Sequence, residues 1–285
     1  MFFRLLTLTT LLSSLTLATP AVIDLWPHSV PGQNTPKQAP EVSPNKAGNV
    51  TRLSKVTTPT LTVYHPTPET NNHTAIIVCP GGGYNILAID KEGYEIGQWL
   101  SKHGYTACVL QYRVPRNQDG ALQDAQRAIR LARSKSQQWS TNKVGVLGFS
   151  AGGSLSARVS ALHPTPLYPP IDVIDNHTPR PDFAILIYPA FLDQGPQQSL
   201  SPDIQIDPNF PPSFLFVTGD DRFANSSLVM AKSLQSKKRP YQLHIYPKGG
   251  HGYGIRPGNP AAETWPNLCI KWLNKNVLTQ PLSKK

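Results

Sequence analysis

The chain has 285 residues, of which 39% are hydrophobic, and a formal net charge of +10. This length is ample for a sizeable core and suits one large α/β domain or two small ones. The basic residues are scattered, and their densest groups, at 237–239 and 284–285, are short and not interleaved with aromatic residues. The composition therefore indicates a solvated basic surface and no nucleic-acid groove.

The first residues are typical of an export signal. Arg4 is the only charge in a short N-terminal region, an apolar stretch follows, and small residues surround Ala18. Because that stretch is short and diluted by Thr and Ser, it favours a cleaved signal peptide over residues 1–18 rather than a membrane anchor. Later segments are not apolar enough for a spanning helix, so the sequence predicts a secreted or periplasmic protein.

The rest of the chain divides into a lead-in and one catalytic domain. Residues 19–60 are rich in Pro, Asn, Lys and Thr, and we expect an extended segment that wraps the domain. Strand and helix patterns then alternate over residues 61–280, which predicts a mostly parallel sheet covered on both faces, without a large cap. The expected strands are 61–65, 74–79, 106–114, 144–149, 183–189, 213–219 and 241–247. The expected helices are 91–104, 121–139, 151–162, 227–238 and 264–278.

Two minor expectations concern single side chains. In the second helix, apolar residues recur at a period near 3.6, so we expect Arg127, Arg130 and Arg133 to face solvent. Three cysteines lie in apolar strand or helix patterns and read as small buried side chains, Cys79, Cys108 and Cys269.

Residues 148–152 read Gly-Phe-Ser-Ala-Gly and stand between an apolar strand and a helix pattern. In this context the serine occupies a sharp turn that lifts its hydroxyl above the sheet, and the small neighbours let the turn pack closely. The alternative is a plain tight turn. The strand, turn and helix context favours Ser150 as a nucleophile.

A serine hydroxyl needs a base, and the base needs a carboxylate that orients it. His251 follows the last expected strand between glycines, where a loop can reach the carboxyl edge of the sheet. The chain order Ser, Asp, His places the acid after the penultimate strand, which ends at Asp220 and Asp221. We favour Asp221, with Asp220 capping the turn or pointing to solvent and Asp193 as the fallback.

Three consecutive glycines, 81–83, end an early strand. Exposed N–H groups at such a place can bind a developing oxyanion, and we expect the donors to be Gly82 or Gly83 together with Ala151. A phosphate cradle is the rival interpretation, but no Walker or GxGxxG pattern is completed. Neither HExxH nor another metal-ligand spacing is present, so we expect no metal or organic cofactor.

The residues beside these motifs should shape the substrate site. Tyr84, Asn85, Ile86 and Tyr253 are placed to line its rim, with Tyr84, Asn85 and Tyr253 named as substrate-binding residues, although each is also an ordinary loop residue. Only about two dozen residues connect the strands at 183–189 and 213–219, and typical connections are short whereas lids are long. We therefore expect an open site suited to hydrophilic substrates with small acyl groups.

Together the segments CPGGGY, AIDKEGYEIGQWLSKHGYTACVLQYRVP, VGVLGFSAGGSL, RPDFAILIYPAFLD and KGGHGYG resemble secreted α/β-hydrolase esterases of the acetylxylan esterase-like group, also labelled xylanase-associated or dienelactone-hydrolase-like. The resemblance covers roughly residues 60–275. It implies an α/β-hydrolase fold, a triad of Ser150, Asp221 and His251, and hydrolysis of O-acetyl esters on carbohydrates. Pro80 stands where lipases of this fold often have His, which leaves open which backbone groups form the oxyanion hole.

The expected partner is thus a small-molecule or oligosaccharide ester, with no obligate protein partner. Two other functions stay open: a peptidase or lipase on the same fold, and a catalytically silent carbohydrate-binding protein.

Overall fold

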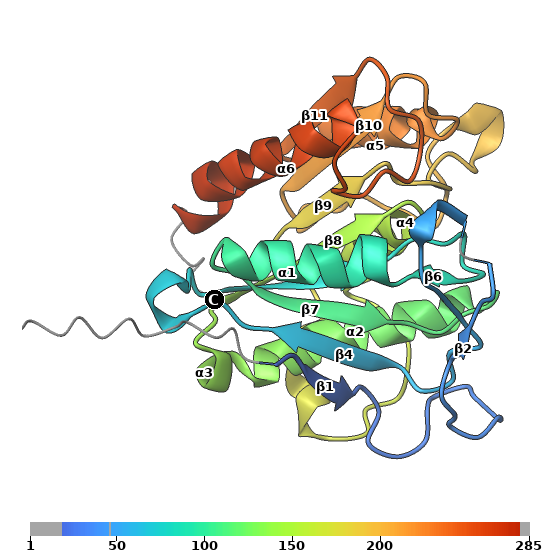
Figure 1. The fold of residues 1–285 in the computed structure, drawn as a ribbon, viewed down its shortest axis with the longest axis vertical. Helices are drawn as coiled ribbons and strands as arrows, with labels where there is room; N and C mark the ends of the chain where they lie inside the picture. Colours follow the sequence, from blue (N-terminus) through green and yellow to red (C-terminus); the bar gives the residue numbers. More distant parts are fainter. Residues whose placement is uncertain (1–18, 46, 280–285) are drawn as a thin grey trace, which may run out of the picture.

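The computed structural model describes residues 19–45 and 47–279, so the predicted signal peptide lies outside the described residues. Its main feature is an eight-stranded sheet in the order β1-β4-β7-β5-β8-β9-β10-β11 (Figure 1). The strands are β1 (Ala21–Asp24), β4 (Thr60–Tyr64), β7 (Thr106–Gln111), β5 (Thr74–Cys79), β8 (Lys143–Phe149), β9 (Ala184–Ile187), β10 (Ser213–Thr218) and β11 (Tyr241–Tyr246).

The sheet is parallel from β7 to β11, whereas β1 and β4 pair antiparallel at one end. Every residue of β5, β9 and β10 is buried, as expected for parallel strands covered on both faces. Because parallel strands end at the same edge, the residues that follow β5, β8, β10 and β11 meet there. The predicted alternation of strands and helices is confirmed.

Helices cover the two faces of this sheet. On the face toward the viewer in Figure 1 lie α1 (Glu95–Lys102) and α6 (Pro260–Leu273), whose Trp99 and Trp265 rings have centroids 5.3 Å apart. On the other face, α2 (Gln118–Ser134) packs against α4 (Ala151–Ala161). The short α3 (Ser136–Trp139) follows α2, and α5 (Ala224–Ser236) packs on β10 and β11. Two π-helical segments complete the set, η3 (Asp90–Tyr94) before α1 and η6 (Asn274–Leu278) after α6.

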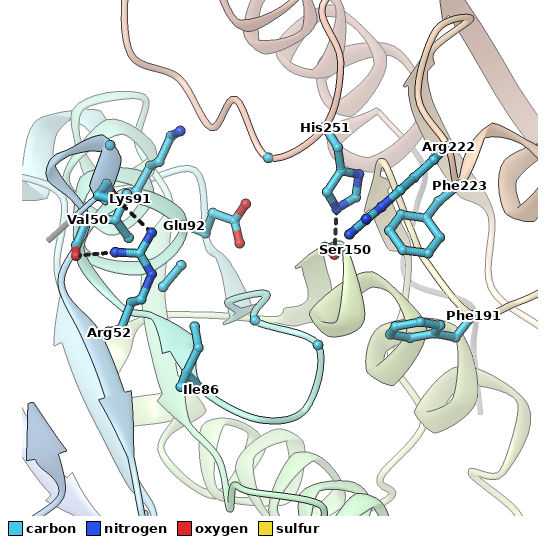
Figure 2. Close-up of a pocket in the computed structure, with 16 residues that line it drawn as sticks. Val50, Arg52, Ile86, Lys91, Glu92, Ser150, Phe191, Arg222, Phe223 and His251 are labelled. Atoms are coloured by element: carbon cyan, nitrogen blue, oxygen red, sulfur yellow. Dashed lines mark hydrogen bonds between the residues drawn. The ribbon is translucent and has the colours of Figure 1, made fainter. Parts of the chain in front are cut away.

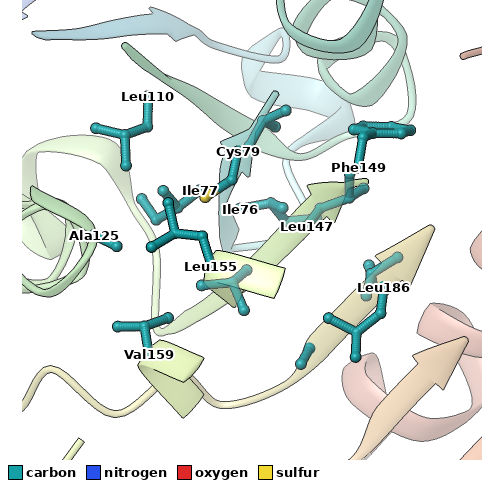
Figure 3. Packing of buried hydrophobic residues seen from close by; sticks show 14 of the residues in the cluster. Ile76, Ile77, Cys79, Leu110, Ala125, Leu147, Phe149, Leu155, Val159 and Leu186 are labelled. Atoms are coloured by element: carbon teal, nitrogen blue, oxygen red, sulfur yellow. The ribbon is translucent and has the colours of Figure 1, made fainter. Parts of the chain in front are cut away.

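The core lies between the central strands and α4. Figure 3 shows Ile77 and Leu147 of the sheet packed with Leu155 and Val159 of that helix, all buried. The three cysteines are buried and free, and burial raises the pKa of Cys79 to about 12. They are therefore apolar packing groups rather than reactive thiolates.

The expectation that the arginines of α2 face solvent is wrong. Arg127 is 1% exposed and Arg130 is 8% exposed. A one-turn 3-10 helix, Val173–Asn176, covers this face of α2 and brings Asp175 within 3.0 Å of Arg127 and 3.3 Å of Arg130. The guanidinium groups can be buried because these ion pairs and hydrogen bonds satisfy them.

The N-terminal lead-in is more ordered than its composition predicts. It contributes β1 to the edge of the main sheet. It also supplies β2 (Glu41–Val42) and β3 (Arg52–Ser54) of a small second sheet, in which β3 pairs with β2 on one side and with β6 (Leu87–Ala88) on the other. Because β6 directly follows the glycines at 81–83, this second sheet brings the lead-in next to the end of β5.

Candidate active site

Ser150 occupies a sharp turn between β8 and α4. Its φ of 52° and ψ of −117° lie in a region that side chains rarely adopt, and its carbonyl accepts the N–H of Ala190 at 3.0 Å. A Cβ on Gly148 would lie 2.0 Å from the carbonyl oxygen of Gly152, and one on Gly152 would lie 2.0 Å from that of Cys79. Both positions therefore require glycine, and the turn is held against the strand ends on either side.

Ser150, His251 and Asp221 form one hydrogen-bonded chain. His251 Nε2 lies 2.8 Å from Ser150 Oγ (Figure 2), and His251 Nδ1 lies 2.7 Å from Asp221 Oδ2. The Asp221 side chain is 0% exposed, whereas that of His251 is 22% exposed. Because a carboxylate only accepts, Nδ1 carries the proton and Nε2 is free to accept the serine hydroxyl.

The other two candidate acids occupy different positions. Asp220 Oδ1 accepts the N–H groups of Gly249 and Gly250 at 3.0 and 2.9 Å, and these bonds, that of Gly250 above all, hold the pKa of Asp220 below its usual value. Asp220 thus caps the turn before His251, as expected. Asp193, the fallback, accepts from Asn225 and Ser226 and is not bonded to His251.

Aromatic rings hold the imidazole in place. The rings of Tyr188 and Phe223 lie edge-on to His251, with centroids 5.1 and 4.9 Å away. The flanking Gly250 and Gly252 have φ of 66° and 74°, which glycine adopts without strain. The ring can therefore face Ser150 from a loop that turns sharply on both sides.

The glycine loop after β5 borders Ser150. Gly82 and Gly83 line the same cavity as Ser150, and their N–H groups bond to no acceptor within 19–45 or 47–279. Ala151 begins α4, where the first N–H groups of a helix have no intrahelical partner. The expected oxyanion donors are thus brought to the two sides of Ser150.

The cavity in front of Ser150 has a volume of about 460 Å³. In Figure 2 the phenyl rings of Phe191 and Phe223 lie on one side of Ser150, and Arg52 and Val50 lie on the other. Six further residues form the rest of the wall: Ile86, Ala88, Lys91, Glu92, Arg222 and Gly252. Ala47 and Gly48 complete its edge. A volume of this order suits a small ligand or one or two sugar rings.

Of the four residues expected at the rim, Ile86 lines this cavity, whereas Tyr84, Asn85 and Tyr253 do not. Tyr84 and Tyr253 are 6% and 4% exposed, and the Tyr253 ring packs edge-on against Tyr188 with centroids 4.4 Å apart. Asn85 is exposed and donates to the carbonyl of Gly83. Adjacency in sequence to the glycines and to His251 therefore does not by itself place a side chain in the cavity wall.

The residues that do form the wall were largely missed. Residues 188–212, between β9 and β10, contain one 3-10 turn (Pro196–Gln198) and no cap domain, as the short connection predicts. The lead-in instead supplies Ala47 to Arg52 as part of the wall. This segment lies some 100 residues before Ser150 in the chain, and its sequence contains no pattern that predicts a place in the cavity wall. Its clustered polar residues and prolines are compatible with an ordered loop.

Glu92 is the other residue that sequence analysis overlooked. It is 4% exposed, and Oε2 accepts the N–H of Gly81 at 2.8 Å while Oε1 accepts the hydroxyl of Tyr188 at 2.9 Å. Burial raises the pKa of Glu92, and the two hydrogen bonds and the charge of His251 oppose that rise. A carboxyl group in the sequence Lys-Glu-Gly, at a helix start, is most often a solvated residue, which is why it did not stand out.

Two absences concern the described residues only. Within 19–45 and 47–279, no three His, Cys, Asp or Glu side chains are grouped so that they could hold a metal ion. In the same part of the chain no helix has the length and apolar character needed to cross a bilayer.

The chain is similar in sequence to curated proteins named for esterase or xylanase activity. A family model described as BD-FAE matches residues 61–166. The acetylxylan esterase of Xylanibacter ruminicola is 29% identical over 216 residues, which are 66% of this chain and 42% of that protein. The endo-1,4-beta-xylanase B of Butyrivibrio fibrisolvens is 28% identical over 63% of this chain and 32% of its own length. The chain thus matches less than half the length of these curated relatives.

Solved structures match over more of the chain. The acetyl ester-xyloside bifunctional hydrolase from Caldicellulosiruptor lactoaceticus is 28% identical, with a TM-score of 0.72 over 92% of this chain and 98% of that one. MGS-M1, an α/β hydrolase enzyme from a deep-sea metagenome library of the Medee basin, has a TM-score of 0.64 at 24% identity, over 90% and 96%. Its likeness concerns the fold alone.

Proposed function

We propose that the chain is an acetylxylan esterase-like α/β-hydrolase, a secreted serine esterase that removes short acyl groups, acetyl above all, from carbohydrates such as acetylated xylan or xylo-oligosaccharides. The observation that carries this proposal is the hydrogen-bonded chain from Ser150 through His251 to Asp221, which opens on a cavity bordered by glycine N–H groups. The names of the relatives support the substrate class.

In this proposal catalysis proceeds by acyl transfer. His251 Nε2 takes the proton of Ser150 as the hydroxyl oxygen attacks the ester carbonyl carbon. The N–H groups of Gly82 or Gly83 and of Ala151 stabilise the oxyanion, and Asp221 stabilises the imidazolium. His251 then protonates the departing sugar oxygen, which leaves as a hydroxyl group. Water, activated by the same imidazole, releases the acid from Ser150.

The cavity supports a small acyl group on a polar alcohol. Phe191 and Phe223, with ring centroids 5.3 Å apart, close one side of Ser150, while the opposite side carries Arg52 and Lys91. An apolar corner of this kind accommodates a methyl group, and a wall of charged side chains suits sugar hydroxyls better than a lipid tail.

One panel of substrates tests the proposal against its alternatives. Purified enzyme is assayed with p-nitrophenyl acetate, butyrate and octanoate, with peptide amides, and with acetylated xylo-oligosaccharides, from which released acetate is measured. We expect kcat/KM to fall from acetyl to octanoyl, acetate to be released from the oligosaccharides, and amides to be inert. A preference for octanoate would favour a lipase, cleaved amides a peptidase, and no turnover a binding protein.

The same panel should include a p-nitrophenyl xyloside. Glycosidases use a pair of carboxyl groups that flank the scissile bond. Among the described residues lining the cavity, Glu92 is the one carboxyl group, because Asp221 lies behind His251. We therefore expect acetate release without cleavage of glycosidic bonds, whereas xyloside turnover that depends on Glu92 would contradict this.

A further inference from the structure

Glu92 is a buried carboxyl group that the proposed acyl-transfer steps do not use. It lies on the π-helical segment Asp90–Tyr94, and Figure 2 shows its carboxyl group directed toward the space in front of Ser150. Burying a carboxylate costs free energy unless hydrogen bonds compensate it. The groups that donate hydrogen bonds to the Glu92 carboxylate therefore indicate which parts of the site it connects.

Glu92 has two such partners, and one of them connects it to a third part of the site. Gly81, which donates to Oε2, begins the glycine loop, and Tyr188, which donates to Oε1, directly follows β9. The Tyr188 oxygen in turn accepts the N–H of Gly254, three residues after His251, at 2.9 Å. The chain of hydrogen bonds from Gly254 through Tyr188 and Glu92 to Gly81 thus joins the loop of the base to the loop of the oxyanion donors.

The contacts around Gly81 are tight. A Cβ at this position would lie 2.6 Å from Glu92 Oε2 and 2.9 Å from the Cβ of Ser150. The Gly81 backbone is therefore clamped between the carboxylate and the nucleophile, and Gly82 and Gly83 follow it directly into the cavity. A shift of Glu92 would therefore reach Gly82 and Gly83, the expected oxyanion donors, through the backbone of Gly81.

Burial raises the pKa of Glu92, whereas the hydrogen bonds from Tyr188 and Gly81 favour its ionised form and oppose that rise. Burial and the neighbouring Glu92 raise the pKa of Tyr188 well above its usual value, so it remains a hydroxyl that donates to Glu92. A carboxylate can accept from Gly81 and Tyr188 at once, one bond on each oxygen. An amide has only one oxygen, so a glutamine here would turn an NH₂ group toward one of the two donors.

We propose that Glu92 is a positioning residue, which through Gly81 on one side and Tyr188 on the other holds the oxyanion loop and the His251 loop in their reactive arrangement around Ser150. This rests on the proposed function, since it assigns Glu92 a part in the same esterase reaction. Glu92 acts through these groups and does not itself exchange a proton with the substrate.

The test is a pair of isosteric substitutions, Glu92→Gln and Tyr188→Phe, with their combination. Misplacement of oxyanion donors by a fraction of an ångström acts on the transition state, so each single variant should lower kcat on p-nitrophenyl acetate about 10- to 100-fold. KM should stay within about threefold. Because both residues belong to one chain of hydrogen bonds, the double variant should lose little more than the worse single variant.

The matched control is Glu263→Gln. Glu263 also accepts the N–H of a loop glycine, Gly258 at 2.8 Å, but it is exposed on α6 and does not line the cavity. Its kcat should match that of the unsubstituted enzyme. For every variant, the amount of a radiolabelled organophosphate bound at Ser150 per chain and the thermal unfolding midpoint separate slow turnover from loss of folded protein.

Three results would overturn the positioning role. The first is a kcat within twofold of the control for both Glu92→Gln and Tyr188→Phe. The second is a fall in kcat/KM that comes from KM alone. The third is a fall in kcat that is fully explained by fewer chains labelled at Ser150. If Glu92→Gln fails to fold, Tyr188→Phe decides by the same criteria. An unsubstituted enzyme that neither turns over acetate esters nor is labelled at Ser150 would instead remove the proposed function, and this role with it.

Discussion

Ser150 combines a strained backbone with burial, since the residue is only 8% exposed. The strain is maintained by glycine contacts at 148 and 152 and by hydrogen bonds to the chain after β9, so it does not depend on the Ser150 side chain. The hydroxyl of Ser150 can therefore be removed by substitution without disturbing the fold, which allows its proposed role as nucleophile to be tested.

Ser150→Ala should therefore abolish turnover and leave the protein folded. Removing a triad nucleophile costs several orders of magnitude in kcat, on the order of 10⁶ in a well-studied serine hydrolase. The thermal midpoint should change by less than about 2 °C, since no core volume or hydrogen-bonded framework is lost. Steady-state assays with p-nitrophenyl acetate and thermal unfolding measure both quantities. Retention of a tenth of the activity would exclude Ser150 as the nucleophile.

The adjacent carboxylates Asp220 and Asp221 allow a second test at the same scale. Asp221→Asn keeps the shape but favours the wrong imidazole tautomer, so kcat should fall about 10⁴-fold. Asp220→Asn still offers an amide oxygen to Gly249 and Gly250, and it should cost less than about tenfold. Measured kcat values for the two variants decide, and the reverse ranking would assign the orienting role to Asp220.

At the scale of elements, the sequence predicted what depends on local pattern. Apolar runs such as residues 74–79 mark buried strands because parallel strands exclude polar residues on both faces, and the GxSxG motif marks the turn because its geometry needs glycine. The arginines of α2 were placed wrongly because local periodicity cannot reveal that residues 172–175, more than 40 positions later, cover that face with carboxylates.

This buried cluster yields a prediction about stability. Arg127→Leu should lower the free energy of unfolding by about 3 kcal/mol, because Asp175, which is 0% exposed, loses one of its two arginine partners. Arg133→Leu is the comparison, since Arg133 pairs with the partly exposed Asp182, and it should cost about 1 kcal/mol or less. Urea unfolding measures both. Equal values for the two variants would show that the Arg127 pair contributes no more than a surface pair.

At the scale of the whole molecule, the cavity combines parts that lie far apart in the chain. The triad and the glycine loop could be predicted because each follows a recognisable strand and the strands end at one edge. The wall formed by Ala47 to Arg52 could not, because it depends on the pairing of β3 with β6 and on Arg256. Arg256, five residues after His251, donates to the carbonyls of Gly48 and Asn49 and also to Glu95 and Asp90.

Arg256 therefore ties the N-terminal wall to the loop of His251, and its loss should affect extended substrates selectively. In Arg256→Ala, the contacts to the Gly48 and Asn49 carbonyls disappear, while the hydrogen bonds of Ser150, His251 and Asp221 are untouched. A sugar chain that extends beyond the acyl group should bind less tightly when the N-terminal wall is loosened. KM for acetylated xylo-oligosaccharides should therefore rise about 5- to 20-fold, whereas kcat on p-nitrophenyl acetate should stay within about twofold.

The comparison variant is Arg133→Ala, which removes an arginine that also bridges a carboxylate and a carbonyl but lies outside the cavity. It should change neither constant. Acetate release at several oligosaccharide concentrations, beside p-nitrophenol release from the small ester, gives KM and kcat for all three proteins. An equal loss on both substrates would mean that Arg256 supports the triad itself, and an unchanged KM for the oligosaccharides would mean that the N-terminal wall does not contact the sugar chain.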